Sequence, residues 1–313
     1  MKIRDSHFFN LQDTLFKYLL LACSLIVVGL FVAIFLMLLN TSWQSIFANG
    51  LGFFTGSVWD PIHDVYGALP AIVGTIVAAS MATLLALPIS LGIAIFFTEY
   101  MPTRLRFILS LFIDLLAAIP SVIFGIWGLW IVAPLLKSSI EQPIVGAIGF
   151  IPLFSGPAYG LSLFLAVIVL TIMVIPIVSS LTIELISKTP IALKEGMISL
   201  GATKWETIKH IALPFARLGI FAAVILGLGR ALGETMAVTM VIGNSYSLPF
   251  PFGSLFWPSI TITSKVASEW YEAAPGIEVS SLIEMALVLL LITVVINVVS
   301  RYMIKRISKR GFG

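Results

Sequence analysis

Six long runs of apolar residues constrain the fold of this chain more than any other feature of its sequence. The runs cover about residues 18–39, 69–97, 107–134, 161–186, 218–243 and 281–303. Each provides roughly the 20 residues that a helix needs to cross a bilayer, and lipid offers no partner for unpaired backbone groups, so these segments must be helical. Only 11% of the residues are charged, against about 25% in soluble domains. The sequence therefore predicts an all-α integral membrane protein with six transmembrane helices.

The distribution of Lys and Arg predicts how the chain is oriented. If the N-terminus is cytoplasmic, all 18 Lys and Arg residues except Lys137, Lys265 and Arg230 fall in segments on the cytoplasmic side. Positive charge is retained on the side of the membrane where the protein is synthesised. We therefore expect both termini of this multi-pass protein to be cytoplasmic.

One membrane domain accounts for nearly the whole chain. It covers residues 18–303, between a cytoplasmic tail of residues 1–17 and a basic cytoplasmic tail of residues 304–313. The first apolar run is longer than the roughly 7–15 residues of a signal-peptide core, so we expect a retained helix. Cys23 is the sole cysteine, which excludes an intrachain disulfide. The three histidines are scattered and the net charge is only +3, so we expect no metal site and no nucleic-acid partner.

Small residues recur at helical spacing in two of the apolar runs. They are Gly74, Ala78, Ala82 and Ala86 in the second run, and Gly219, Ala223, Gly227 and Ala231 in the fifth. Faces of this kind let membrane helices approach closely. The pattern predicts a tightly packed helix bundle.

Two features of the outer side leave alternatives open. Residues 250–262 are too apolar for an ordinary solvated loop, and they either rest on the bilayer surface or plug the outer mouth of a pathway. Glu284, just inside the sixth run, either lines an outer vestibule or caps a helix.

The longest cytoplasmic loop, residues 187–217, predicts a short helical hairpin. Thr189-Pro190 is typical of a helix start, Gly201 suits a helix end, and Thr203 with Glu206 forms a capping box for a second helix. Pro214 is expected to end or kink that second helix. Apolar residues recur on one face of each helix: Leu193, Met197 and Leu200 in the first, and Trp205, Ile208 and Ala212 in the second. The hairpin is either a compact loop tucked under its own bundle or a docking element for a cytoplasmic partner.

The spacing of residues in this hairpin resembles a known family signature. Glu195-Gly196-Met197, then Gly201, then Ile211-Ala212-Leu213-Pro214 gives E-x(5)-G-x(9)-I-x-L-P, which is similar to the EAA loop of binding-protein-dependent ABC importer permeases. Gly196 and Met197 stand where alanines are usual. The resemblance implies the six-helix type I importer (MetI-like) fold, with a cytoplasmic coupling helix that docks on an ATP-binding subunit. It assigns this coupling to Glu195, Leu200, Gly201, Trp205 and Pro214.

The chain has no G-x-x-x-x-G-K-[ST] motif for holding ATP phosphates. We therefore predict a transport subunit that is not itself an enzyme and binds no cofactor, with ATP and Mg²⁺ held by a separate ATPase.

Arg230 and Glu234 are charges within the fifth apolar run. Their spacing of four residues would place both side chains on one helical face, within pairing distance. An Arg at the bilayer centre costs about 2.5–3.5 kcal/mol on insertion scales, so it requires a partner or a watery path. Either the two charges, joined by Asp114, only fix helix packing, or Arg230 meets an anion that crosses the membrane. A guanidinium suits a tetrahedral oxyanion because it donates paired hydrogen bonds.

Three segments resemble a subfamily of these permeases. Residues 227–238, 113–128 and 255–264 are similar to the corresponding stretches of PstC-type phosphate permeases. The resemblance implies transport of phosphate by alternating access, with Arg230, Glu234 and, as a further candidate, Asp114 in the substrate path. It implies a second, PstA-like permease, two PstB-like ATPase subunits and a periplasmic PstS-like phosphate-binding protein as partners, within the lipid of a bacterial inner membrane. Sulfate or molybdate as the cargo, and an ATP-independent channel or carrier, remain as alternatives.

Overall fold

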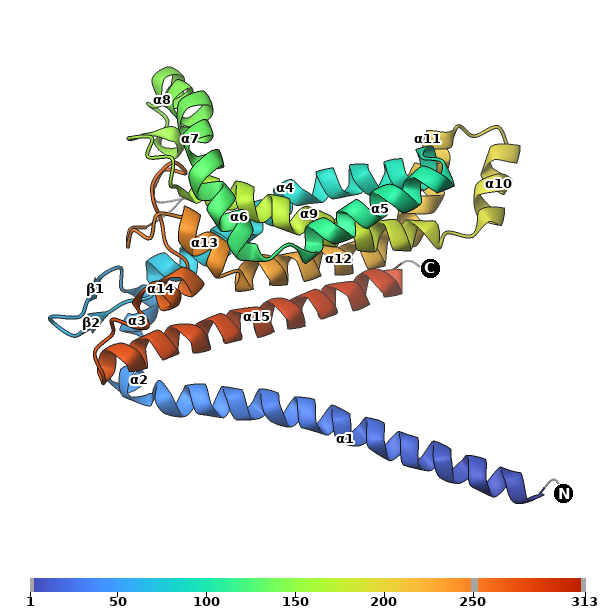
Figure 1. The fold of residues 1–313 in the computed structure, drawn as a ribbon, viewed down its shortest axis with the longest axis horizontal. Helices are drawn as coiled ribbons and strands as arrows, with labels where there is room; N and C mark the ends of the chain where they lie inside the picture. The colour runs from blue at the N-terminus through green and yellow to red at the C-terminus, as the bar shows by residue number, and fades with distance from the viewer. Residues whose placement is uncertain (1–2, 249–252, 311–313) are drawn as a thin grey trace.

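The computed structural model of the chain (Figure 1) describes residues 3–248 and 253–310. Six of its helices are long and apolar enough to cross a membrane: residues 13–41, 69–100, 121–148, 163–187, 204–233 and 277–306. The prediction of a six-helix, all-α membrane protein is therefore confirmed. Some helices run through short π-helical turns, so one crossing can contain several labelled elements.

The elements follow one another in a simple order. The first part of the chain contains α1 (Ile3–Thr41), α2 (Trp43–Asn49), α3 (Gly52–Thr55), an antiparallel pair of two-residue strands, β1 (Trp59–Asp60) and β2 (Val65–Tyr66), and α4 (Leu69–Ile95) with a π-helical turn at Phe96–Tyr100. The middle part contains α5 (Thr103–Ala118), α6 (Ser121–Trp127), α7 (Ala133–Leu136), α8 (Gln142–Ile148), a 3-10 turn at Pro152–Phe154, and α9 (Leu163–Ser187), with further π-helical turns at Gly128–Val132 and Lys137–Glu141. The last part contains α10 (Ile191–Ser199), α11 (Lys204–Thr207), a π-helical turn at Ile208–Ala212, α12 (Leu213–Gly233), α13 (Met236–Val241), α14 (Ile262–Glu269) and α15 (Ile277–Arg310).

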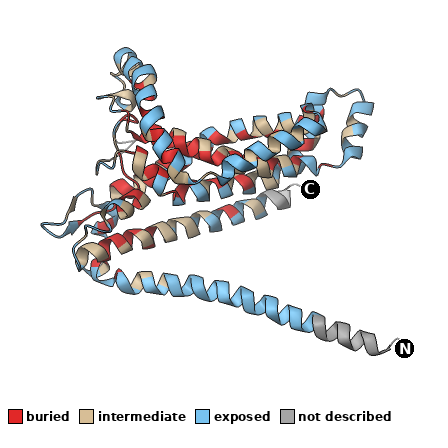
Figure 2. Cartoon of the chain, viewed as in Figure 1, coloured by how far each residue is buried: buried red, intermediate tan, exposed pale blue. Residues whose placement is uncertain are grey.

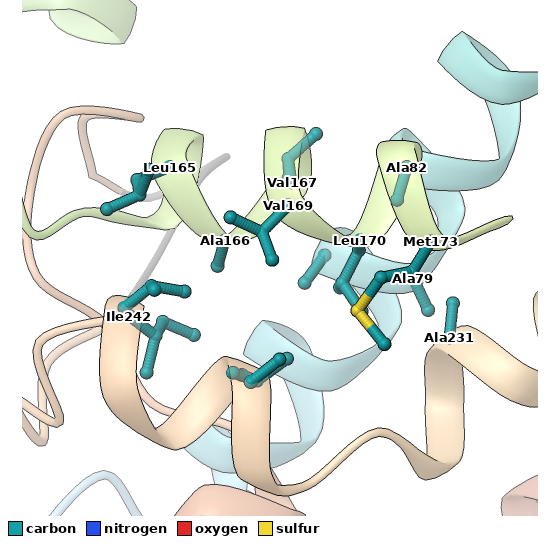
Figure 3. Packing of buried hydrophobic residues seen from close by; sticks show 14 of the residues in the cluster. Ala79, Ala82, Leu165, Ala166, Val167, Val169, Leu170, Met173, Ala231 and Ile242 are labelled. Atoms are coloured by element: carbon teal, nitrogen blue, oxygen red, sulfur yellow. The ribbon is translucent and has the colours of Figure 1, made fainter. Parts of the chain in front are cut away.

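The centre of the bundle is α9, which packs most extensively against α4 and next against α12. The small-residue faces predicted in the second and fifth runs lie at these contacts. Ala82 and Ala231, for example, are buried around Leu170 and Met173 of α9 (Figure 3). A side chain at Gly227 would meet Val174 and Val178 of α9, so glycine is needed there for close approach.

The predicted third span, residues 107–134, is not one helix. The chain is extended at Ile119 and Pro120, which separate α5 from α6. Proline lacks a backbone N–H and disfavours helical geometry in the residue before it. The membrane-length helix therefore covers residues 121–148 instead, while α5 packs along α9 and α6 to α8 leave the bundle at an angle (Figure 1).

The predicted fifth span, residues 218–243, is also corrected. The helix begins earlier, at Lys204, and continues through the π-helical turn into α12, which ends at Gly233. Of the two predicted tails, residues 3–17 are the start of α1 and residues 304–310 are the end of α15.

The apolar loop predicted on the outer side packs into the protein. Residues 250–252 lie outside the described part, but Leu255, Phe256 and Ile260 are buried in the bundle core. Main-chain bonds anchor the segment, because Phe164 donates to the carbonyl of Leu255 at 2.9 Å and Ser259 donates to that of Ile242 at 2.9 Å. Residues 253–262 therefore do not rest on a bilayer surface.

Different elements lie at the two ends of the bundle. Both termini and α10 lie at one end, whereas α8, α14 and the strand pair lie at the other (Figure 1). Most of α1 and much of the α10 hairpin are exposed (Figure 2). The apolar stretch of α1 has no buried residue, and among the described elements it packs mainly against α15 and less against α2.

Candidate functional site

A charged pair lies where the fifth span breaks. Arg230 is in the last turn of α12, and Glu234 is the first residue beyond it, with extended backbone (φ −70°, ψ 125°). Nη2 of Arg230 lies 3.9 Å from Oε2 of Glu234. The two side chains therefore meet as the spacing suggested, although the helix expected to continue through both residues ends at Gly233.

The pair is unequal in exposure and loose in geometry. The Arg230 side chain is 42% exposed, whereas that of Glu234 is 8% exposed. A separation of 3.9 Å is too long for a hydrogen bond, and a partly exposed ion pair of this kind contributes little to stability. The guanidinium therefore has donors available for another anion.

The buried carboxylate and its main chain are fixed by neighbouring elements. Oε1 of Glu234 accepts a hydrogen bond from the N–H of Ala237 at 3.4 Å, and its main-chain carbonyl accepts one from the hydroxyl of Thr263 at 2.8 Å. Thr263 is in α14, whose first residue, Ile262, donates its N–H to the hydroxyl of Thr75 in α4 at 2.9 Å. Neither Thr75 nor Thr263 was predicted as a site residue from the sequence. The feature that could have identified them is a hydroxyl side chain within a strongly apolar stretch.

Asp114 and Glu284 have other partners. Asp114 is exposed on α5 and accepts a hydrogen bond from Ser180 of α9 at 3.1 Å; within the described residues it makes no ion pair with Arg230. Glu284 is buried in α15 and accepts a hydrogen bond from Ser45 of α2 at 2.5 Å. Glu284 therefore joins two helices, rather than lining a vestibule or capping a helix.

The hairpin between α9 and α12 has most of the predicted caps. Gly201 has a positive φ of 87°, at the end of α10, and Thr203 and Glu206 form both halves of the capping box of α11. A helix does start directly after Thr189-Pro190, but Pro190 and not Thr189 is its cap residue, and the buried Thr189 hydroxyl has no hydrogen-bond partner. Pro214 is the second residue of α12 and does not end the helix.

The hairpin presents apolar side chains to solvent. Leu200 is 86% exposed at its tip, and Trp205 and Glu195 are exposed as well. Ile208 and Ala212 are buried against the bundle, whereas Trp205 is 55% exposed, so only part of the apolar face expected on the second helix packs inside the chain. The exposed side chains of Glu195, Leu200 and Trp205 therefore form a surface at the hairpin that a partner could cover.

In residues 3–248 and 253–310, no three His, Cys, Asp or Glu side chains gather in a way that could hold a metal ion.

Comparisons with solved structures agree with this fold. A bacterial ABC transporter involved in the import of the acidic polysaccharide alginate has a chain that aligns with a TM-score of 0.60 and 17% identity, over 95% of this chain and 99% of that one. A chain of the MetNI methionine ABC transporter aligns with a TM-score of 0.58 and 15% identity, over 80% of this chain and 99% of that one.

Sequence relatives are much more similar. The phosphate transport system permease protein PstC of Haemophilus influenzae is 42% identical over 99% of both chains. The PstC protein of Mesorhizobium japonicum is 40% identical over 96% of this chain and 93% of that one. A probable PstC protein of Methanocaldococcus jannaschii is 38% identical over 93% of both. Residues 86–310 match the model of the binding-protein-dependent transport system inner membrane components, and the chain belongs to that family.

Proposed function

We propose that this chain is a membrane-spanning permease subunit of an ATP-driven phosphate importer. The observation that carries the proposal is the half-exposed guanidinium of Arg230, loosely paired at a helix break, in a chain whose relatives are phosphate permeases. Arg230 would donate two parallel hydrogen bonds to phosphate oxygens. A permease must also release its cargo, and the nearby carboxylate of Glu234 weakens the grip of Arg230 on the anion.

Glu234 also supports phosphate over sulfate. Phosphate near neutral pH carries a proton that sulfate lacks, and the carboxylate of Glu234 can accept a hydrogen bond from that protonated oxygen. Towards sulfate or molybdate the same carboxylate would only repel.

The exposed hairpin supports coupling to a separate ATPase. Leu200 and Trp205 are apolar side chains in solvent, and a PstB-like ATPase dimer that holds ATP and Mg²⁺ would cover them. Both termini and α10 lie at one end of the bundle, and the Lys and Arg distribution assigns this end to the cytoplasm. The remaining partners are a PstA-like second permease, which completes the pathway for alternating access, and a PstS-like periplasmic phosphate-binding protein.

The test is ATP hydrolysis and anion uptake by the assembled complex in proteoliposomes. Phosphate with its binding protein should stimulate both, and sulfate should stimulate neither. Arg230→Gln should lower phosphate uptake about 10- to 100-fold, the loss expected for hydrogen bonds to a charged group worth about 1.5–3 kcal/mol. Glu234→Gln should narrow the preference for phosphate over sulfate.

Two controls make the result interpretable. Arg301→Gln removes an exposed Arg from α15 and should leave uptake unchanged. Normal uptake by Arg230→Gln at normal expression would refute the substrate-path role. Uptake without any ATPase subunit would instead identify a channel or carrier.

A further inference from the structure

We propose that Glu99 and Tyr100, at the hairpin end of α4, clasp the coupling hairpin and transmit its movement to α4 as well as to α12. They are positioning residues for transport, and the inference rests on the proposed function of the hairpin as the ATPase contact. It adds a second mechanical connection beside the direct run of chain from α11 into α12.

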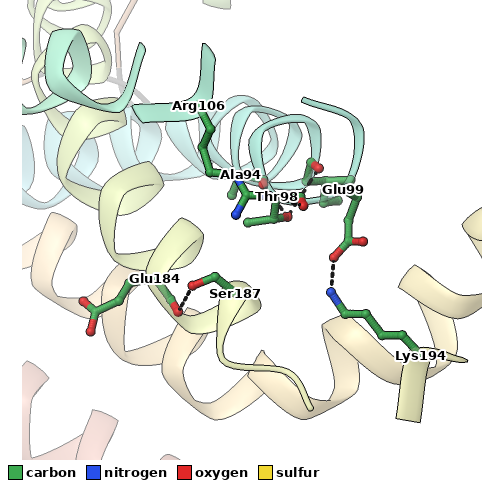
Figure 4. Close-up of polar contacts among 8 residues, drawn as sticks. Ala94, Thr98, Glu99, Arg106, Glu184, Ser187 and Lys194 are labelled. Atoms are coloured by element: carbon green, nitrogen blue, oxygen red, sulfur yellow. Dashed lines mark hydrogen bonds and ion pairs between the residues drawn. The ribbon is translucent and has the colours of Figure 1, made fainter. Parts of the chain in front are cut away.

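The clasp, defined as Glu99 and Tyr100, contacts both helices of the hairpin, α10 and α11. Nζ of Lys194 in α10 lies 2.5 Å from Oε1 of Glu99 (Figure 4). Nζ of Lys204, at the start of α11, lies 4.6 Å from the centre of the Tyr100 ring, which is within cation–π range. Lys194 and Lys204 lie on opposite sides of Gly201, so two consecutive residues of α4's π-helical turn hold the two sides of the hairpin bend.

Burial distinguishes this ion pair from an ordinary surface pair. The side chains of Lys194 and Glu99 are 20% and 10% exposed. The pair of Lys188 and Glu184 has a similar separation of 2.6 Å, but its side chains are 64% and 59% exposed and lie on neighbouring turns. Exposed pairs contribute little, whereas removing one partner of a shielded pair leaves an uncompensated charge. Lys188 and Glu184 therefore provide a matched control.

The π-helical turn that contains Glu99 and Tyr100 is itself held in place by hydrogen bonds. Nη2 of Arg106 in α5 donates to the carbonyl of Thr98 at 2.6 Å, and the Thr98 hydroxyl donates to the carbonyl of Ala94 at 2.8 Å (Figure 4). A force applied at Glu99 therefore acts on α4 as a whole and not on a loose chain end.

At its other end α4 reaches the charged pair. Thr75 of α4 accepts the N–H of Ile262, and the next residue, Thr263, donates to the carbonyl of Glu234. Side-chain contacts thus join one end of α4 to the coupling hairpin and the other end, through α14, to the main chain of Glu234. A packed helix bonded at both ends is the kind of rigid element that can carry coupling between distant sites.

The test compares phosphate moved per ATP hydrolysed by the assembled complex in proteoliposomes. Lys194→Glu and Glu99→Lys should each lower this ratio by roughly threefold or more, within the range of coupling changes seen for such residues. The double swap, Glu99→Lys with Lys194→Glu, should restore it. Lys188→Glu should leave it unchanged.

Two further variants allow the test to be made even if the charge-reversed proteins fail to assemble into complexes. Lys194→Met and Tyr100→Leu keep the apolar bulk and should lower the ratio in complexes that retain normal basal ATP hydrolysis. A wild-type ratio in these variants, or a double swap no better than either single change, would overturn the clasp. If the wild-type complex moves sulfate instead of phosphate, the proposed cargo fails, and the same ratio measured with sulfate still tests the clasp.

Discussion

The hydroxyl of Thr263 donates a hydrogen bond to the main-chain carbonyl of Glu234 across 2.8 Å. This bond joins α14, which follows the apolar loop, to the first residue beyond α12. The same loop is anchored to α9 and α13 through main-chain bonds. The break in the fifth span is therefore held in place by a segment that lies far along the chain from it.

Thr263→Val should loosen this attachment while conserving side-chain shape. A lost hydrogen bond to a largely buried group costs about 1–3 kcal/mol, so amides of α13 and α14 should exchange with solvent several-fold faster. Thr239→Val is the control, since the Thr239 hydroxyl bonds the carbonyl of Thr235 within its own helix turn. Equal exchange in the two variants would show that the Thr263 bond does not hold α14.

Gly74→Ala should destabilise the protein because α4 approaches the loop closely. A Cβ atom at Gly74 would clash with the carbonyl oxygen of Ile260, which belongs to the backbone and cannot rotate away. Overpacking of this kind costs about 1–3 kcal/mol, and thermal unfolding in detergent should detect it. Gly92→Ala in the same helix meets no atom within 4 Å, so it should be neutral or stabilising by up to about 1 kcal/mol. A stable Gly74→Ala protein would show that the loop moves aside.

Leu200→Ser should weaken assembly with the ATPase without weakening the permease fold. Leu200 is exposed at the hairpin tip, so its removal loses no packing inside this chain. An apolar residue at the centre of an interface can contribute about 2 kcal/mol, which predicts at least a tenfold weaker association in a pull-down titration. Tyr271→Ser alters an exposed apolar residue at the other end of the molecule and should bind normally. Unchanged association of Leu200→Ser would mean that the ATPase contacts another surface.

Lys265 should make stability depend on pH. Its side chain is buried between the rings of Trp59 and Tyr246 and pairs with Glu269. Burial lowers the pKa of Lys265 below its ordinary value of 10.5, and Glu269 offsets only part of that effect. Between the folded and the ordinary pKa, the unfolded chain holds a proton that the folded chain does not, so the free energy of unfolding rises with pH.

The Lys265→Met variant isolates this contribution. The melting temperature of the wild type relative to Lys265→Met should increase as the pH rises towards 10.5. Lys137→Met, which removes an exposed lysine, shows the effect of deleting a charge alone. Parallel curves for the wild type and Lys265→Met would contradict a lowered pKa at this position.

The lengths of the apolar runs predicted the number of membrane helices, but composition did not predict where helices break. Pro88 and Pro176 lie inside the intact helices α4 and α9, whereas Pro120 separates two helices. All three prolines occur in apolar runs, and the outcome depends on whether neighbouring helices satisfy the freed backbone groups. That information lies in the packing and not in the local sequence.

In the candidate site, too, the contacts between residues close in sequence were predictable and the long-range contacts were not. Arg230 and Glu234 could be paired from their spacing, and Gly201 and the Thr203 cap from local rules, because those interactions are short in sequence. The Thr75 bond to Ile262 spans 187 residues, and the Lys194 bond to Glu99 spans 95. Contacts of that range depend on how the helices are arranged, so no local pattern predicts them.

The π-helical turn at Ile208–Ala212 also sets the direction in which Arg230 points. It lies within the continuous helix that connects the hairpin to the charged pair. Each residue of an α-helix rotates the chain by about 100° about the axis, so the rotational phase of Arg230 relative to Trp205 depends on the number of residues in that turn. A single-residue deletion there would leave the helix intact and rotate Arg230 towards a different neighbour. The length of this turn is therefore under constraint even where its side chains are not.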